Sequence, residues 1–117
     1  MRLRELVGLL RGEVVTGEDL LDKTEVSACF AADLMSDVLA FCQPGALLLT
    51  GLISIQAAQT ADIADLAAVV FVSGKRPAAP VVQFAVEKGL PLLATRLSLF
   101  EACGVLHAAS LGSAGRG

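Results

Sequence analysis

Residues 46–72, "ALLLTGLISIQAAQTADIADLAAVVFV", contain the pattern that decides the fold. Two apolar runs, 46–50 and 67–72, have the length of strands that are buried on both faces, and the segment between them, 53–65, has helical spacing. Continuously apolar strands joined by a helix are typical of a parallel sheet covered on both sides. This stretch therefore predicts a strand–helix–strand unit of an α/β domain.

The hydrophobic pattern that predicts strands and helices is weaker upstream of this unit. Residues 3–10 have the spacing of an amphipathic helix, residues 13–21 begin as a strand, and residues 24–32 read as a second strand. A short helix with Asp33 at its N-cap should follow. The side chains expected to face inward from this helix are Leu34, Val38 and Phe41.

Downstream, the alternation of strand and helix repeats. A helix is expected at 78–88, a strand at 91–95 and a last helix at 98–107. Ser98 and Glu101 form the S-x-x-E pattern of a capping box, which marks the start of this last helix.

The complete pattern predicts one compact α/β domain over residues 1–107, with a mainly parallel sheet of about five strands and helices on both faces. The chain of 117 residues is long enough for a single core. Residues 108–117 are small and rich in glycine, and they are predicted to form a flexible C-terminal tail.

Composition and charge exclude several classes of protein. A net charge of −3, with no basic run and no aromatic cluster, argues against a nucleic-acid partner. Polar residues and Pro44 interrupt the uncharged stretch 38–61, so it does not predict a membrane span. The N-terminal segment lacks the pattern of a secretory signal, and a cytoplasmic location is expected. An apolar content of 55% predicts apolar surface left over once the core is filled.

Cations and hydroxyls follow the ends of the predicted strands. Lys75 and Arg76 come after the strand at 67–72, and Arg96 follows the strand at 91–95. The carboxyl ends of parallel strands meet at one edge of a sheet, which is where open α/β sheets bind ligands. The other polar or glycine residues expected on this edge are Thr50, Ser73, Gly74, Thr95 and Ser98.

Two interpretations of these residues stay open. Hydroxyls, glycine N–H groups and cations on one edge suit a phosphate or carboxylate. Loops are also where proteins keep solvated charges, so Lys75 and Arg76 fit an ordinary turn equally well. Ser98 has a sufficient role as a helix cap.

The sequence contains few residues of the kinds that catalytic sites use. His107 is the single histidine and lies in a predicted last helical turn, where a capping or packing role suffices. The three cysteines are widely spaced in apolar surroundings, as buried thiols are, so we expect no metal and no cofactor. Neither a P-loop nor a G-x-G-x-x-G motif is present. The sequence therefore predicts a protein that is not an enzyme.

Several segments, in their order and spacing, resemble the DRTGG domain family from about Val7 to Leu106. They are "AADLMSDVLAF" (31–41), "LLLTG" (47–51), "QAAQTADIADLAAVVFVSG" (56–74) and "GLPLLATRLSLFEACGVL" (89–106). The Asp-Arg of the family motif, expected after Gly51, is replaced by "LISIQ", and its Thr-Gly-Gly appears as Ser73-Gly74-Lys75.

The family is similar to the N-terminal domain of HPr kinase/phosphorylase and to an internal segment of some phosphotransacetylases, and it also occurs beside CBS domains. The resemblance implies a free-standing regulatory or adaptor domain. Together with the cations at the edge of the sheet, it favours a homodimer that senses a phosphorylated or nucleotide-like molecule. Ser36 and Asp37 would complete the site if the second strand neighbours the third. The alternative is an adaptor without a ligand that uses the apolar surface of residues 38–61 to dimerise or to dock on a metabolic enzyme.

Overall fold

The structure of this protein is a computed structural model that describes residues 1–115. Its longest helices have ten residues, so no helix in this part of the chain is long and apolar enough to cross a membrane. In chain order the elements are α1 (Leu3–Leu9), β1 (Glu13–Thr16), the 3₁₀ turn η1 (Glu18–Leu20), β2 (Ala28–Ala31), α2 (Met35–Phe41), β3 (Leu47–Thr50), α3 (Ile55–Ile63), β4 (Ala68–Phe71), α4 (Ala79–Lys88), β5 (Leu92–Ala94), α5 (Leu99–Ala108) and β6 (Gly112–Ser113).

The sheet confirms the predicted fold class. Its strands lie in the order β1-β5-β4-β3-β2-β6, and every pair is parallel except β1 with β5. Because β1 is antiparallel, its first residue, Glu13, lies opposite Ala94 at the end of β5. The start of β1 therefore joins the carboxyl ends of the parallel strands at one edge of the sheet.

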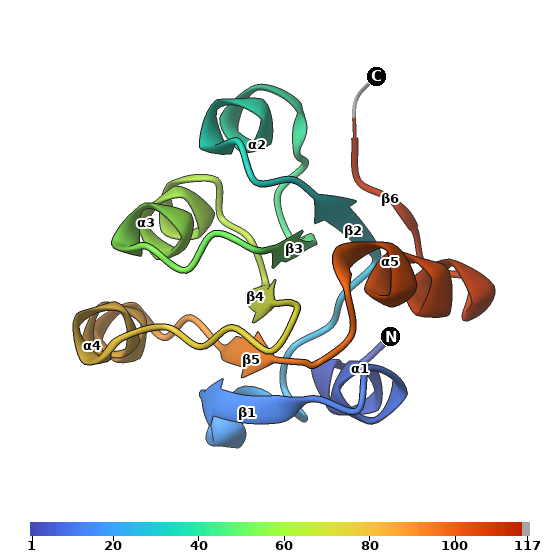
Figure 1. The fold of residues 1–117 in the computed structure, drawn as a ribbon, viewed down its shortest axis with the longest axis horizontal. Coiled ribbons are helices and arrows are strands. Elements are labelled where there is room, and N and C mark those ends of the chain that lie inside the picture. Colours follow the sequence, from blue (N-terminus) through green and yellow to red (C-terminus); the bar gives the residue numbers. More distant parts are fainter. Residues whose placement is uncertain (116–117) are drawn as a thin grey trace.

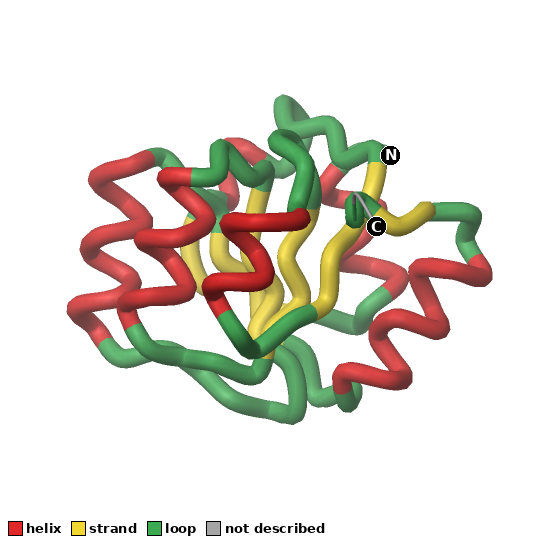
Figure 2. The backbone as a smooth tube through the Cα atoms, turned by 90° about the horizontal axis from the view of Figure 1, so that it is seen from above, coloured by secondary structure: helices red, strands yellow, loops and turns green. Residues whose placement is uncertain are grey.

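Helices cover both faces of the sheet, as the apolar strands predicted (Figures 1 and 2). On one face, α2, α3 and α4 pack over Leu48 and its neighbours. On the other face, α1 and α5 pack over Leu47 and Leu49. Successive side chains of a strand point to opposite faces, so a run such as Leu47–Leu49 serves both layers of the core.

The start of α2 differs from the prediction. The N-cap is Leu34, and the Asp33 carboxylate instead accepts hydrogen bonds from residues at the end of β3. Leu34 and Phe41 were expected to face inward, but they are 61% and 49% exposed, and only Val38 of the three is buried. The seven-residue helix packs against α3, and Val38 is the one of these three residues that covers the core beneath it.

The structure also differs from the predicted tail over residues 108–115. After α5 the chain returns to the sheet as β6, which pairs with β2. Leu111 and Ala114 are buried, and the N–H group of Ala114 donates to the carbonyl of Cys29. A Cβ atom at Gly115 would lie 3.5 Å from the Phe30 ring, so this glycine allows the chain to lie close against β2. Residues 116–117 lie outside the described residues.

Candidate functional site

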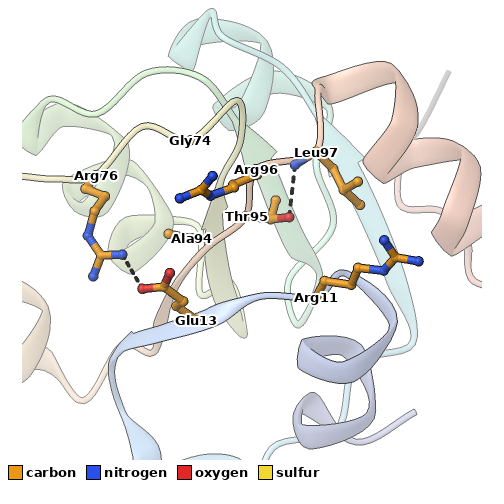
Figure 3. A pocket seen from close by; sticks show the side chains of 8 residues that line it. All are labelled: Arg11, Glu13, Gly74, Arg76, Ala94, Thr95, Arg96 and Leu97. Atoms are coloured by element: carbon orange, nitrogen blue, oxygen red, sulfur yellow. Dashed lines mark hydrogen bonds and ion pairs between the residues drawn. The ribbon is translucent and has the colours of Figure 1, made fainter.

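A pocket lies where β1 meets the loops that follow β4 and β5 (Figure 3). Its volume is about 380 Å³, within the range typical of small-molecule sites. We call it the basic pocket. The residues that line it are Arg11, Glu13, Gly74, Arg76, Ala94, Thr95, Arg96 and Leu97.

Three arginines from three segments of the chain contribute to this pocket. Arg76 forms an ion pair with Glu13, with 2.5 Å between Nη1 and Oε2. Arg11 and Arg96 are exposed, and within residues 1–115 neither side chain forms a hydrogen bond or an ion pair. Figure 3 shows the Arg96 side chain extending toward Gly74 and Arg76, while that of Arg11 extends the other way, past Leu97. The pocket is therefore positively charged.

Thr95 positions the wall of the pocket. Its side chain is buried, and its hydroxyl donates to the carbonyl of Leu10 over 2.7 Å and accepts from the N–H group of Leu97 over 3.2 Å. The bond to Leu10 fixes the turn between α1 and β1, in which Arg11 has a positive φ of 50°. Thr95 thus holds Arg11 and Glu13 at the edge of the sheet and has its own hydrogen bonds satisfied.

Ser73 and Gly74 connect the loops after β4 and β5. Both have positive φ angles, 62° and 72°. Their N–H groups donate to the carbonyls of Leu97 and Thr95 over 2.8 Å and 2.9 Å. The N–H groups that the sequence offered to an anion are therefore bonded within the protein, and their role is to hold the two loops side by side.

A second polar cluster lies over β3, next to the basic pocket. The buried Thr50 hydroxyl donates to Asp33 Oδ1 over 3.1 Å, and the Gly51 N–H group donates to the same oxygen over 2.7 Å. Lys75 Nζ donates to the Gly51 carbonyl over 3.2 Å. A Cβ atom at Gly51 would lie 3.4 Å from Lys75 Nζ and 3.5 Å from Asp33 Oδ1. These contacts hold Lys75 and Asp33 against the end of β3.

The remaining predicted residues lie away from the basic pocket. β2 does neighbour β3, yet Ser36 lines a groove between α2 and α3, and Asp37 lines a separate hollow beside β2 and β6. Ser98 Oγ accepts from the N–H group of Glu101, and the Glu101 carboxylate accepts from the Ser98 N–H group. Hydrogen bonding to the Glu101 carboxylate, first from the Ser98 backbone and second from the Ser98 side chain, lowers the pKa of Glu101. The capping box is therefore as predicted.

Sequence reasoning placed Arg96 at the edge of the sheet but did not include Arg11, Glu13 or Asp33 in the site. Arg11 and Glu13 flank Gly12 just after the first helix, and they reach the pocket only because β1 is antiparallel. The short spacing of helix, glycine and strand predicts a tight turn there, but it does not predict the strand pairing that brings the turn to the pocket. Asp33 was interpreted as a helix cap, and nothing local distinguishes that role from its bonds to β3.

The part of the chain that the structure describes contains no cluster of metal-binding side chains. Among residues 1–115, no group of three or more histidine, cysteine, aspartate or glutamate side chains is arranged to hold one. Burial raises the pKa of the Cys29 and Cys103 thiols, which disfavours the thiolate form that metals and electrophiles need.

Fold and site together define a small α/β domain with a positively charged pocket at the carboxyl edge of a mainly parallel sheet. The family model described as the DRTGG domain matches residues 5–109. The chain therefore belongs to the DRTGG domain family.

One solved structure shares the fold. It contains the CBS and DRTGG domains of the regulatory region of Clostridium perfringens pyrophosphatase, complexed with its activator diadenosine tetraphosphate. The match has a TM-score of 0.72 at 13% sequence identity, and it covers 90% of this chain and 45% of that chain. At this identity the likeness shows the fold alone. A search of curated proteins gave no match.

Proposed function

We propose that this domain is a cytoplasmic, non-catalytic regulatory module that binds a phosphorylated or nucleotide-like small molecule in the basic pocket. The observation that carries the proposal is the gathering of Arg11, Arg76 and Arg96 around one cavity, with Glu13 as the single carboxylate. The three arginines are contributed by three separate segments, so the fold itself, and no local charge run, brings them together.

The chemistry of these side chains suits a phosphate group. A guanidinium presents several donors in a planar fork that matches phosphate oxygens, and such charge-assisted hydrogen bonds are about twice as strong as neutral ones. Arg11 and Arg96 have no internal anion within residues 1–115, so they are available to a ligand. Ala94 and Leu97 add an apolar wall on which the uncharged part of a nucleotide would rest.

The other predicted residues in and around the pocket have supporting roles in this proposal. Thr95, Ser73 and Gly74 hold the loops, and Lys75 adds a positive charge on the adjoining loop. The solved structure that shares this fold belongs to a regulatory region with a nucleotide activator, and this supports a regulatory role in a larger enzyme or beside an enzyme partner. A homodimer is the expected state of such a module.

The first experiment is a thermal-shift measurement at one fixed salt concentration. The panel contains nucleotides, acetyl phosphate, coenzyme A, inorganic phosphate and pyrophosphate, with adenosine as the uncharged control. A ligand at 100 times its Kd that binds only the folded state stabilises it by about 2.7 kcal/mol, which raises the Tm of a domain of this size by several degrees. The proposal expects a dose-dependent rise for a phosphorylated compound and none for adenosine.

A matched pair of variants tests the site itself. Arg11→Ala with Arg96→Ala should abolish the shift, whereas Arg4→Ala should leave it intact, because Arg4 pairs with Asp22 at the far end of α1. A shift of equal size in the parent and in the double variant would contradict the proposed site. A flat panel for the parent would contradict the proposed function.

The alternative function, an adaptor without a ligand, rests on a different observation. Large apolar side chains are exposed beside the groove between α2 and α3, notably Leu34, Leu39 and Ile63 at 61%, 52% and 74%. An adaptor would form a stable dimer or complex whose Tm ignores every compound in the panel. Light scattering of the parent and of Leu39→Ser with Ile63→Ser would show whether this surface holds the oligomer together.

A further inference from the structure

The ion pair between Glu13 and Arg76 lies inside the basic pocket (Figure 3). It joins residues 63 positions apart in the sequence. Of the three arginines of the pocket, Arg76 is the one that has an internal anion within residues 1–115. The Glu13 carboxylate thus occupies a guanidinium that the proposed ligand would also use.

From this geometry we infer that Glu13 is an internal competitor, and that a phosphate group binds by displacing its carboxylate from Arg76. The inference rests on the proposed function, because it concerns the same pocket. It adds a mechanism by which the site selects its ligand. The Glu13 carboxylate is a weakly bound anion within the pocket, and only an anion that interacts more strongly with the arginines replaces it.

The position of Glu13 allows this exchange without unfolding. Its side chain is 67% exposed, so the displaced carboxylate returns to water. Glu13 is the first residue of β1, an edge strand whose register against β5 shifts between Val14 and Thr16. The turn before it stays fixed by the bond between Thr95 and Leu10. Rotation of one side chain is therefore sufficient.

A phosphate group has two advantages over the carboxylate. It carries more charge and a third oxygen, so it can bond to Arg76 and to a second arginine at once. The second arginine is Arg96, whose side chain extends toward Arg76 and has no internal partner among residues 1–115 (Figure 3). Small carboxylates offer no more than Glu13 already supplies. The ion pair therefore makes the pocket selective for phosphate and diphosphate groups.

The test is the Kd of inorganic pyrophosphate for the parent and for Glu13→Gln, by titration calorimetry at one salt concentration. An exposed ion pair is worth up to about 1 kcal/mol, so its loss should tighten binding by up to roughly fivefold. Asp22→Asn is the matched control. It changes the net charge equally and releases Arg4 from a similar exposed pair, and it should leave the Kd unchanged.

A second comparison asks whether Glu13 acts through Arg76. In an Arg76→Gln background, the gain from Glu13→Gln should shrink to the part caused by removing a negative charge near the anion. A Kd equal in the parent and in Glu13→Gln would overturn the competition and leave the proposed function standing. Weaker binding by Glu13→Gln would overturn it too, because Glu13 would then be a contact for the ligand. Absence of pyrophosphate binding to both proteins would overturn the inference, and the thermal-shift panel would then decide the proposed function separately.

Discussion

The loops after β3 and β5 have the same local design. Each begins with a buried threonine whose hydroxyl accepts a hydrogen bond from the N–H group two residues later, Thr50 from Leu52 and Thr95 from Leu97. Each then leads to a serine at the N-cap of a helix. Despite this likeness, the first loop lies against Lys75 and Asp33, whereas the second lines the basic pocket.

The difference lies in the group to which each threonine donates. Thr50 donates to the Asp33 carboxylate, and the nearby Lys75 ammonium lies over Gly51. Thr95 donates to a neutral carbonyl, that of Leu10, and is followed by Arg96. Charge over β3 is thus balanced within the protein, whereas charge over β5 is left in excess. The comparison indicates that the group to which a strand-end hydroxyl donates, more than the sequence of the loop, decides whether that edge of the sheet can bind an anion.

The largest effect should come from removing the two hydroxyls. Thr95→Val leaves the Leu10 carbonyl and the Leu97 N–H group without their bonds in a buried place, which should lower the free energy of unfolding by about 1–3 kcal/mol. Thr50→Val should cost about 1 kcal/mol, since the exposed Asp33 carboxylate regains water. Urea unfolding measures both. Equal losses would show that the two loops are equivalent.

The binding of pyrophosphate should separate the two loops next. Arg96→Ala should weaken it about tenfold, or about 1.4 kcal/mol, because a charge-assisted bond is lost. Lys75→Ala should weaken it less than about twofold, because Lys75 already donates to the Gly51 carbonyl. Calorimetry at constant salt gives both values. A larger effect at Lys75 would indicate that pyrophosphate binds at the surface over β3 and not in the basic pocket.

The two helix caps should differ by a smaller amount. Ser98 accepts a bond from Glu101 in a complete capping box, whereas Ser54, at the start of α3, makes no side-chain bond of this kind. Ser98→Ala should therefore lower the free energy of unfolding by about 1 kcal/mol, and Ser54→Ala should leave it unchanged. A substantial loss at Ser54 would mean that its hydroxyl caps α3 in solution.

The smallest effect is a pH dependence confined to the loop after β5. The bonds from Ser98 lower the pKa of Glu101 in the folded protein. Its carboxylate therefore stabilises the fold above the pKa of an unfolded glutamate, and this stabilisation is lost as pH falls through the folded pKa. Urea midpoints of the parent and of Glu101→Gln should converge as pH falls through this range. A constant difference would contradict the role of the charge.

The fold could be predicted because its signals are local. Runs such as Leu47–Leu49 are apolar on both faces, and this alone indicates a covered parallel sheet. The Ser98–Glu101 box was also predictable, since its two partners are three residues apart. Where a local signal was ambiguous the prediction was wrong, as with Asp33, whose carboxylate bonds to the end of β3 in place of capping α2.

The pocket could be predicted only in part, because its residues meet through strand order. Placing Arg76 and Arg96 at one edge required no more than a parallel sheet. To predict that Arg11 and Glu13 lie beside them, one would have to know that β1 pairs antiparallel with β5, and no residue pattern in the sequence indicates this pairing. The bond that fixes this corner joins residues 85 positions apart, Leu10 and Thr95.

The two outer strands of the sheet have a consequence for the behaviour of the protein at high concentration. A long, flat edge strand is a template on which other chains can aggregate. Here β6 is two residues long, and β1 carries an irregularity in its register between Val14 and Thr16. Neither edge offers a regular row of backbone groups to another chain. An apolar protein of this kind should therefore resist the growth of β-fibrils while it stays folded.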